Sequence, residues 1–258
     1  MGLYTLEICY LIASICYIMG LKMMAGPKSA RNGNLLAAGG MTLAIIATIF
    51  LYKNDEGNNL GNHLWIFGGI LLGTVFGWMA AKKVQMTAMP QMVSLFNGMG
   101  GACAALIALV EFPKALEHMH ENWNSLFMAT ILCGLVIGST SFFGSMVAYL
   151  KLNGNLKKDI RLPFYNVLNT LLIIGTIGLT VCLSGGHIPN PADFTMWTWV
   201  LLGGASLYGI LFVLPIGGAD MPVVISLLNS FTGMAAMFGG FLYDNMAMLT
   251  GGILVGSA

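Results

Sequence analysis

The sequence predicts an all-α polytopic membrane protein, and three observations lead to this fold class. Of its 258 residues, 57% are hydrophobic and only 8% are charged, and the mean hydropathy is +0.81. Several apolar runs reach the roughly 20 residues that a helix needs to cross a bilayer. The 34 glycines and 19 methionines are spread along the chain, which favours close helix contacts and adaptable packing.

Eight complete membrane spans and one incomplete span follow from the apolar runs. We expect them at residues 3–24, 35–52, 63–82, 90–111, 125–150, 164–184, 196–215, 222–242 and 246–258. The first is a span rather than a signal peptide, because the basic n-region of a signal peptide is missing and Glu7 is present instead. The ninth is roughly 20 Å long at 1.5 Å per residue, which is too short to cross, so we expect the chain to stop inside a membrane helix. Because the loops are short, residues 1–258 are predicted to form a single transmembrane domain.

The charges of the loops predict the orientation of the chain. Nine basic residues flank one set of connections, and only two, Lys53 and Lys114, flank the other. Because basic loops stay in the cytoplasm, we expect the N-terminus outside, the loop that holds Asp220 in the cytoplasm, and the last helix heading inward. The nine basic residues are Lys22, Lys28, Arg31, Lys82, Lys83, Lys151, Lys157, Lys158 and Arg161.

A repeat with an offset of 132 residues relates the fourth and eighth predicted helices. The first copy has Met89, Pro90, Ser94, Leu95, Asn97 and Gly101, and the second has Met221, Pro222, Ser226, Leu227, Asn229 and Gly233. Spacings of three and four residues place the polar members of each copy along one helical face. An amide inside a membrane helix is costly without partners or water. Asn97 and Asn229, with Ser94 and Ser226 beside them, are therefore candidate functional residues.

Two interpretations of these asparagines remain open. Each amide can form a hydrogen bond across a helix interface, which is a common structural use. Two amides in matched registers, each with a serine and a glycine on the same stripe, instead favour a hydrated polar path. Neither amide releases a proton near neutral pH, so these residues can only hold water or orient a neighbouring group.

Asp220 also has two interpretations. A carboxylate beside a helix N-terminus is favoured by the helix dipole, and Pro222 in the first helical turn fits this structural role. The functional alternative is a charge at the mouth of the polar path, where it would sense a docked partner. The small polar residues of the fifth helix, Gly138–Ser145, are expected to allow close helix packing.

No metal, disulfide or nucleotide motif emerges from the sequence. The five cysteines lie in apolar segments without CxxC spacing, so we expect them to be small core residues. The glycines from Gly98 to Gly101 do not complete GxGxxG and follow no strand, and no Walker lysine is present. The four histidines lie on the predicted outer side, where none suits an intramembrane proton relay. They are His63, His118, His120 and His187. For His118 and His120 we favour a solvated loop over a metal cluster.

Five segments of the chain carry a resemblance to a known family. They are IGGADMPVVISLLNS (216–230), KKVQMTAMPQMVSLFN (82–97), SARNGN (29–34), IGSTSFFGSMVAYLKLNG (137–154) and the final GGILVGS (251–257). Over essentially its whole length, the chain resembles the membrane part of the beta subunit of proton-translocating NAD(P)+ transhydrogenase.

The resemblance implies a proton channel that serves hydride transfer between NADH and NADP+. It implies an alpha subunit with the NAD(H) domain and further membrane helices, an NADP(H) domain beyond Ala258, a homodimer of the complex, and the bacterial inner membrane. This chain would have no nucleotide or metal site and would be inactive alone in hydride transfer. Asp220, Asn229, Gly252 and Gly256 match positions that the family uses for proton passage and coupling. Some members have a histidine where Asn97 stands, so we expect the titrating group elsewhere, such as on an alpha-subunit helix.

Two hypotheses follow from the sequence. In the first, Asn97, Asn229, Ser94 and Ser226 line a hydrated path between the fourth, eighth and ninth helices, and coupling occurs near Asp220. In the second, the chain is a stand-alone secondary transporter or small-ion pore that uses the repeated helices as its site. The second hypothesis explains the repeat equally well. It explains poorly the absence of an intramembrane charge.

Overall fold

The computed structural model of the chain describes residues 2–53, 57, 59–117, 123–156, 163–186 and 190–257. Within these ranges there are nine α-helices, two 3-10 turns, and no strand beyond an isolated bridge between Lys53 and Asn59. Six basic residues or histidines that entered the sequence argument lie outside the described residues: His118, His120, Lys157, Lys158, Arg161 and His187.

The predicted helices are all present, with an apolar length that confirms the fold class. Eight of them are long and apolar enough to cross a membrane, and the ninth is shorter. Their bounds are α1 Gly2–Met24, α2 Ala30–Leu51, α3 His63–Lys83, α4 Met89–Glu117, α5 Ser125–Leu152, α6 Tyr165–Ser184, α7 Pro191–Val213, α8 Met221–Leu242 and α9 Met246–Gly256. The turn η1 (Met86–Ala88) precedes α4, and η2 (Gly218–Asp220) precedes α8.

Three helix ends differ from the predicted ones by five or six residues, because apolar runs end where polar helical turns continue. α2 begins at Ala30 rather than 35, since the polar first turn is helical as well. α7 begins at Pro191 rather than 196, after Asn190, whose side chain accepts a hydrogen bond from the Ala192 amide as an N-cap. α4 continues through Pro113 to Glu117 instead of ending at 111.

The described helices divide into two compact units, each of which is described by itself. Unit 1 comprises Met1–Met86 with Asn245–Gly251, and unit 2 comprises Thr87–Asp244 with Gly252–Ala258. α9 therefore contributes residues to both units.

Unit 1 is built on the pair α1 and α2. A Cβ atom added to Gly33 would lie 2.6 Å from the Gly20 carbonyl oxygen, so the two backbones approach closely there. The Tyr10 hydroxyl lies 2.8 Å from Thr48 Oγ1 and accepts a hydrogen bond from Asn245 at 3.3 Å. α3 has no buried residue.

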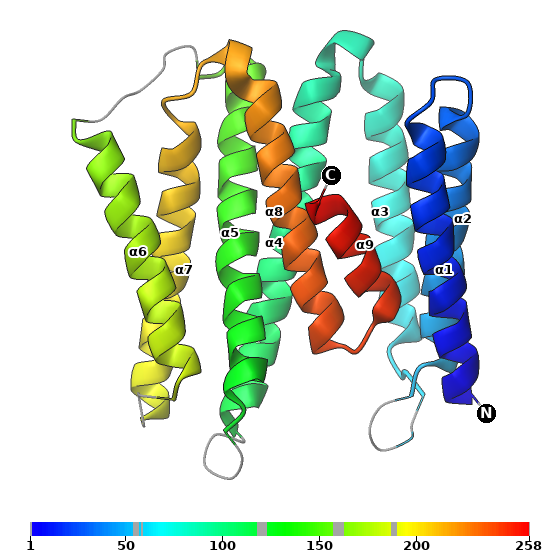
Figure 1. The fold of residues 1–258 in the computed structure, drawn as a ribbon, viewed down its shortest axis with the longest axis horizontal. Helices are drawn as coiled ribbons and strands as arrows, with labels where there is room; N and C mark the ends of the chain where they lie inside the picture. The colour runs from blue at the N-terminus through cyan, green and yellow to red at the C-terminus, as the bar shows by residue number, and fades with distance from the viewer. Residues whose placement is uncertain are drawn as a thin grey trace. The chain divides into compact units, whose positions relative to one another are not determined.

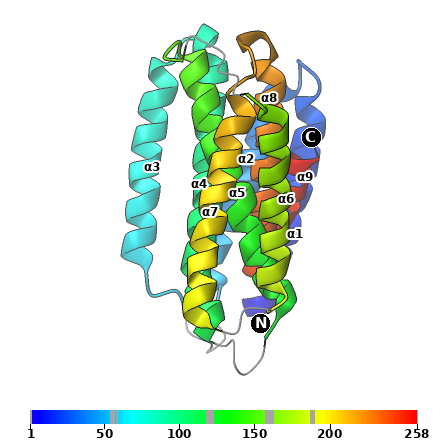
Figure 2. The same cartoon turned by 90° about the vertical axis from the view of Figure 1, so that its left-hand side faces the viewer.

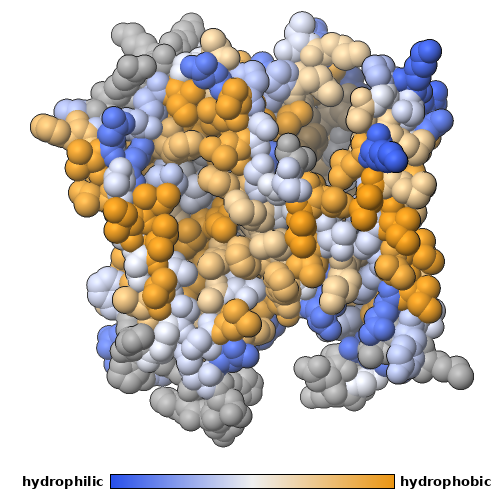
Figure 3. Space-filling model, in the orientation of Figure 1, coloured by the Kyte–Doolittle hydropathy of each residue, from blue (hydrophilic) through white to orange (hydrophobic). Residues whose placement is uncertain are grey.

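Unit 2 is organised around α5. Figure 1 shows α5 in the middle of this unit, with α4 and α8 beside it on one side and α7 and α6 on the other, and Figure 2 shows the same helices turned by 90°. In the most apolar 18-residue stretch of α5, 50% of the residues are buried, a larger share than in any other described helix that could cross a membrane. Apolar side chains cover much of the helices on the face shown in Figure 3, as expected of surfaces that contact lipid.

Two apolar clusters hold the two ends of unit 2 together. At one end, Phe112 of α4 stacks on Phe194 of α7, with ring centroids 5.6 Å apart, beside Met128 of α5. At the other end, Val147 of α5 packs with Val213 of α7 and Met221 of α8. Ser141 and Ser145 of α5 lie between these two clusters.

Candidate functional site

The two copies of the repeat fold alike at their starts. In each copy a 3-10 turn leads directly into a long helix with proline in its first turn, so α4 and α8 begin in the same way. Proline is favoured there because its missing N–H would have no intrahelical partner in any case.

The small residues of α5 permit unusually close helix crossings. A Cβ atom added to either Gly101 of α4 or Gly138 of α5 would lie 2.7 Å from the carbonyl oxygen of the other glycine. On the opposite side, a Cβ atom on Gly209 of α7 would lie 2.5 Å from the Thr140 carbonyl oxygen. The expected close packing of Gly138–Ser145 agrees with these contacts, and it brings short hydroxyl side chains within reach of the neighbouring helices.

Ser94 and Asn97 of α4 bind the same serine of α5. Ser94 Oγ donates a hydrogen bond to the Ser145 carbonyl oxygen at 2.8 Å, and Asn97 Nδ2 donates one to Ser145 Oγ at 3.0 Å. Ser94 is 1% exposed and Asn97 is 8% exposed. Asn97 Oδ1 is buried and accepts no hydrogen bond from any described residue. Because a buried amide oxygen without a donor is costly, this atom distinguishes Asn97 from a fully satisfied interfacial asparagine.

A hydroxyl pair links α8 to the same position. Ser141 Oγ of α5 and Thr232 Oγ1 of α8 lie 2.5 Å apart, and either can be the donor. Ser141 Oγ also lies 3.0 Å from the Leu228 carbonyl oxygen, and Thr232 Oγ1 lies 3.3 Å from the Asn97 carbonyl oxygen. We refer to these two residues with Ser94, Asn97 and Ser145 as the polar cluster. It ties three helices together inside an otherwise apolar region.

The predicted site residues of α8 do not join the polar cluster. Ser226 is exposed, and Asn229 is half-buried without a side-chain hydrogen bond to a described residue. The two copies therefore differ, because the serine and asparagine of α4 face α5, whereas those of α8 do not. The glycines of the repeat do behave alike: Gly101 crosses α5 closely, and Gly233 lies against Gly256 of α9.

Thr232, Ser141 and Ser145 are the members of the polar cluster that sequence reasoning did not select. The two serines belonged to a stripe that was assigned to close packing, and Thr232 carried no prediction. The repeat pairs Thr232 with Gly100, which lies 132 residues earlier, so a hydroxyl on α8 corresponds to a glycine on α4. These two residues face each other, since a Cβ atom on Gly100 would lie 2.8 Å from the Thr232 methyl carbon.

Asp220 lies at the start of α8, at the rim of a surface cavity of about 660 Å³. It is exposed, and its side chain makes no capping hydrogen bond to α8. The cavity is lined by residues 164–167 at the start of α6 and by residues 215–217 of the loop before η2. Lys151 at the end of α5 donates hydrogen bonds to the carbonyl oxygens of Leu214 (2.5 Å) and Ile216 (2.9 Å), which fixes this loop. The carboxylate is thus presented to whatever occupies the cavity.

Gly252 and Gly256 lie where α9 contacts α8. Gly252 is buried against Gly233 and Met237, and Gly256 is half-buried beside Met234, with which an added Cβ atom would make a contact of 3.4 Å. Side chains at Gly252 would overlap the backbone of α8, so this glycine is required for the helix contact. Among the described residues, no group of three or more His, Cys, Asp or Glu side chains forms a metal site.

Comparisons with known proteins point to one family. The family model for the NAD(P) transhydrogenase beta subunit matches residues 6–258. The NAD(P) transhydrogenase subunit beta of Rhodospirillum rubrum is 33% identical over 253 residues, which cover 96% of this chain and 52% of that protein. A second Rhodospirillum rubrum sequence of the same description matches to the same extent. The chain therefore spans about half the length of the curated relatives it matches.

Proposed function

This chain belongs to the NAD(P) transhydrogenase beta subunit family, and we propose that it forms the proton-translocating membrane part of such an enzyme. In this role it couples proton passage to hydride transfer between NADH and NADP+, an oxidoreductase reaction that takes place on soluble domains outside this chain. The observation that carries the proposal, beside the family match, is the polar cluster with its unpartnered Asn97 Oδ1.

In our proposal Asn97 holds water on the proton path. Its Nδ2 is fixed by Ser145, which leaves Oδ1 turned to accept a hydrogen bond from a water molecule or a hydrated proton. The amide itself does not titrate, so it orients the proton carrier without storing the proton. Ser94 holds the same turn of α5 in place, and we keep Asn229 and Ser226 as lining residues of the path on α8.

Coupling requires that the membrane part has different affinities for the soluble domains in its two protonation states. We propose that the surface around Asp220 carries this difference, with Gly252 and Gly256 transmitting shifts between α8 and α9. The exposed carboxylate and the loop that Lys151 anchors support this assignment, because they offer a charged and fixed docking edge.

The wider setting is also a proposal. We propose an alpha subunit with an NAD(H) domain and membrane helices, an NADP(H) domain on the Asp220 side, a homodimer of the whole complex, and a bacterial inner membrane with the N-terminus outside. α3 supports a partner within the membrane: none of its residues is buried, and its glycines Gly68, Gly69, Gly73 and Gly77 have no atom within 4 Å of an added Cβ. The nucleotides are placed on the soluble domains because the sequence has no strand-linked glycine fingerprint.

The test uses the assembled complex in sealed vesicles and measures hydride transfer with and without an imposed pH gradient. Asn97→Leu removes the amide at similar volume, and we expect it to abolish the response to the gradient while assembly is unchanged. Phe96→Leu, at a neighbouring position that is 50% exposed, is the matched control and should behave as the wild type. A normal gradient response in Asn97→Leu would refute the proposed path. The family match does not favour the stand-alone transporter, which would require substrate flux by this chain without partners.

A further inference from the structure

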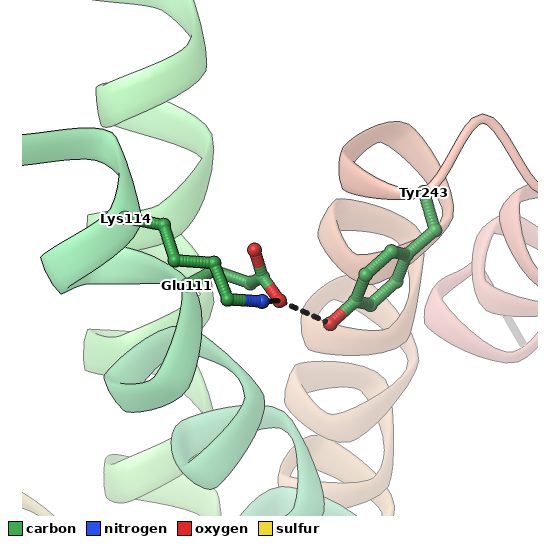
Figure 4. A network of polar contacts seen from close by, with 3 residues as sticks. All are labelled: Glu111, Lys114 and Tyr243. Atoms are coloured by element: carbon green, nitrogen blue, oxygen red, sulfur yellow. Dashed lines mark hydrogen bonds and ion pairs between the residues drawn. The ribbon is translucent and has the colours of Figure 1, made fainter. Parts of the chain in front are cut away.

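Glu111 is a carboxylate inside a membrane helix that the sequence argument had placed at a helix end. α4 continues to Glu117, so Glu111 lies about one and two-thirds turns before the last helical residue. Its side chain is only 15% exposed, whereas that of its neighbour Lys114 is 62% exposed. Figure 4 shows Lys114 and Tyr243 converging on this carboxylate, the former from α4 and the latter from the C-terminal end of α8.

Both partners of Glu111 donate to the same oxygen. Lys114 Nζ lies 2.7 Å from Oε1, and the Tyr243 hydroxyl donates to Oε1 at 3.0 Å. No described residue donates a hydrogen bond to Oε2. The carboxylate can therefore take up a proton on Oε2 and keep its bond from Tyr243, which holds it at the boundary between α4 and α8.

The contact between Glu111 and Tyr243 follows the internal repeat. These residues are 132 positions apart, which is the repeat offset, and so are Gly100 and Thr232, which also face each other. Two contacts at the same offset mean that α4 and α8 lie side by side, parallel and in register, from the polar cluster to Glu111. The carboxylate and the polar cluster thus belong to one interface between α4 and α8.

Small side chains separate the polar cluster from Glu111 along this interface. On α4, Asn97 and Glu111 are 14 residues apart, roughly 21 Å along the helix, with Gly101, Ala104 and Ala108 between them at spacings of four, three, four and three. On α8, Ala236 and Gly239 occupy the same face between Thr232 and Tyr243. On this stretch Gly101 meets Gly138 of α5 and Ala108 belongs to the apolar cluster around Phe112, so closely packed small residues connect the two polar positions.

We propose that Glu111 is the titrating group that takes up protons for this path, at the end of unit 2 opposite Asp220, and that Tyr243 positions it. The inference rests on the proposed function and supplies the proton acceptor that Asn97 and Asn229 cannot be. In the step, a hydrated proton binds Oε2 and gives a neutral carboxylic acid. The O–H bond then breaks as a water molecule accepts the proton, and the carboxylate is restored.

The charged surroundings suit reversible uptake. Lys114 on α4 forms an ion pair with the carboxylate, its Nζ lying 2.7 Å from Oε1. The other charged groups at this end of the described unit are Glu117 on α4, Asp244 after α8 and Asp193 in the first turn of α7, all of them acidic. These negative charges concentrate hydrated protons near Glu111. The remaining neighbours are apolar residues of α4, α5 and α7 around Phe112.

The experiment measures the gradient response of the complete complex in sealed vesicles across a range of pH. We expect Glu111→Gln to lower the gradient-driven rate by at least about a hundredfold, the scale of a lost acid–base group. Glu111→Asp should restore most of the rate with a displaced pH profile, and Lys114→Met should keep the coupling while shifting that profile. Wild-type coupling in Glu111→Gln, or a loss in Glu111→Asp as deep as in Glu111→Gln, overturns the assignment.

A second measurement separates this inference from the proposed function. Infrared difference spectra of the same complex between high and low pH report protonation of carboxyl groups directly, without any turnover. We expect a carboxyl band in the wild type and in Lys114→Met that is missing from Glu111→Gln, even if the wild type were found to move no protons, which would refute the proposed function alone. Identical spectra for the wild type and Glu111→Gln would overturn the role of Glu111.

Discussion

Replacing Ser145 with alanine tests the internal logic of the polar cluster. The Ser145 hydroxyl accepts the hydrogen bond from Asn97 Nδ2, and Asn97 Oδ1 already has no described partner. The variant would therefore leave a buried amide, 8% exposed, without a protein partner at either end. Ser94→Ala is the matched control, because it removes one donor whose acceptor, the Ser145 carbonyl oxygen, keeps its place in the α5 helix.

The two variants should differ in their cost to stability. An unsatisfied buried polar group costs about 1–3 kcal/mol, whereas a hydrogen bond between membrane helices contributes about 0.6 kcal/mol on average. We thus expect a loss of about 2 kcal/mol for Ser145→Ala and about 0.6 kcal/mol for Ser94→Ala. In an Asn97→Leu background there is no amide that can lose its hydrogen-bond partner. Ser145→Ala should therefore lower the free energy of unfolding by less than about 0.5 kcal/mol there.

The assay is detergent-induced unfolding of the four variants in mixed micelles, followed by tryptophan fluorescence. The free energy of unfolding of each single and double variant completes a double-mutant cycle. An equal loss for Ser145→Ala and Ser94→Ala would contradict the reasoning. So would additive losses in the cycle, because they would mean that Asn97 does not depend on Ser145 for its hydrogen bond.

Three further predictions concern packing, the path and the orientation. Gly101→Val should destabilise unit 2 by several kcal/mol, because a Cβ atom there meets the Gly138 carbonyl oxygen at 2.7 Å, while Gly175→Ala, with no atom within 4 Å, should be neutral in the same unfolding assay. Asn229→Leu should abolish proton-linked turnover in sealed vesicles with assembly intact, and wild-type coupled rates would remove this residue from the path. Asp220→Cys should react with an impermeant thiol reagent added from the cytoplasmic side only, and labelling from the opposite side would reverse the orientation predicted from the loop charges.

The sequence was sufficient for the helices because each is determined by its own apolar length. α3 and α6 show this best, since their predicted and observed bounds agree within one residue. The end of α4 could not be predicted from hydropathy, because Pro113 and the charged residues beside it interrupt the apolar run, although Phe112 and Leu116 pack against the apolar cluster. That difference is the reason why Glu111 was predicted to lie at the end of a membrane span.

The candidate site was predicted in part. Ser94 and Asn97 were selected from the repeat, and the structure buries both against α5. The same pattern selected Ser226 and Asn229, which have no such partner, since an identical spacing on α8 faces a different neighbour. Thr232 was missed because its importance comes from a hydroxyl on another helix, which no spacing within α8 reveals.

The sequence by itself determined the membrane fold, the repeat and the residues whose burial demands an explanation, because hydropathy and helical periodicity are local properties. Only the tertiary structure decided which face of each repeated helix meets α5. That choice depends on the glycine contacts between Gly101 and Gly138, which bring two backbones close enough for short hydroxyls to bond across them. The pairing of Glu111 with Tyr243 was likewise decided in three dimensions, since it requires α4 and α8 to lie in register.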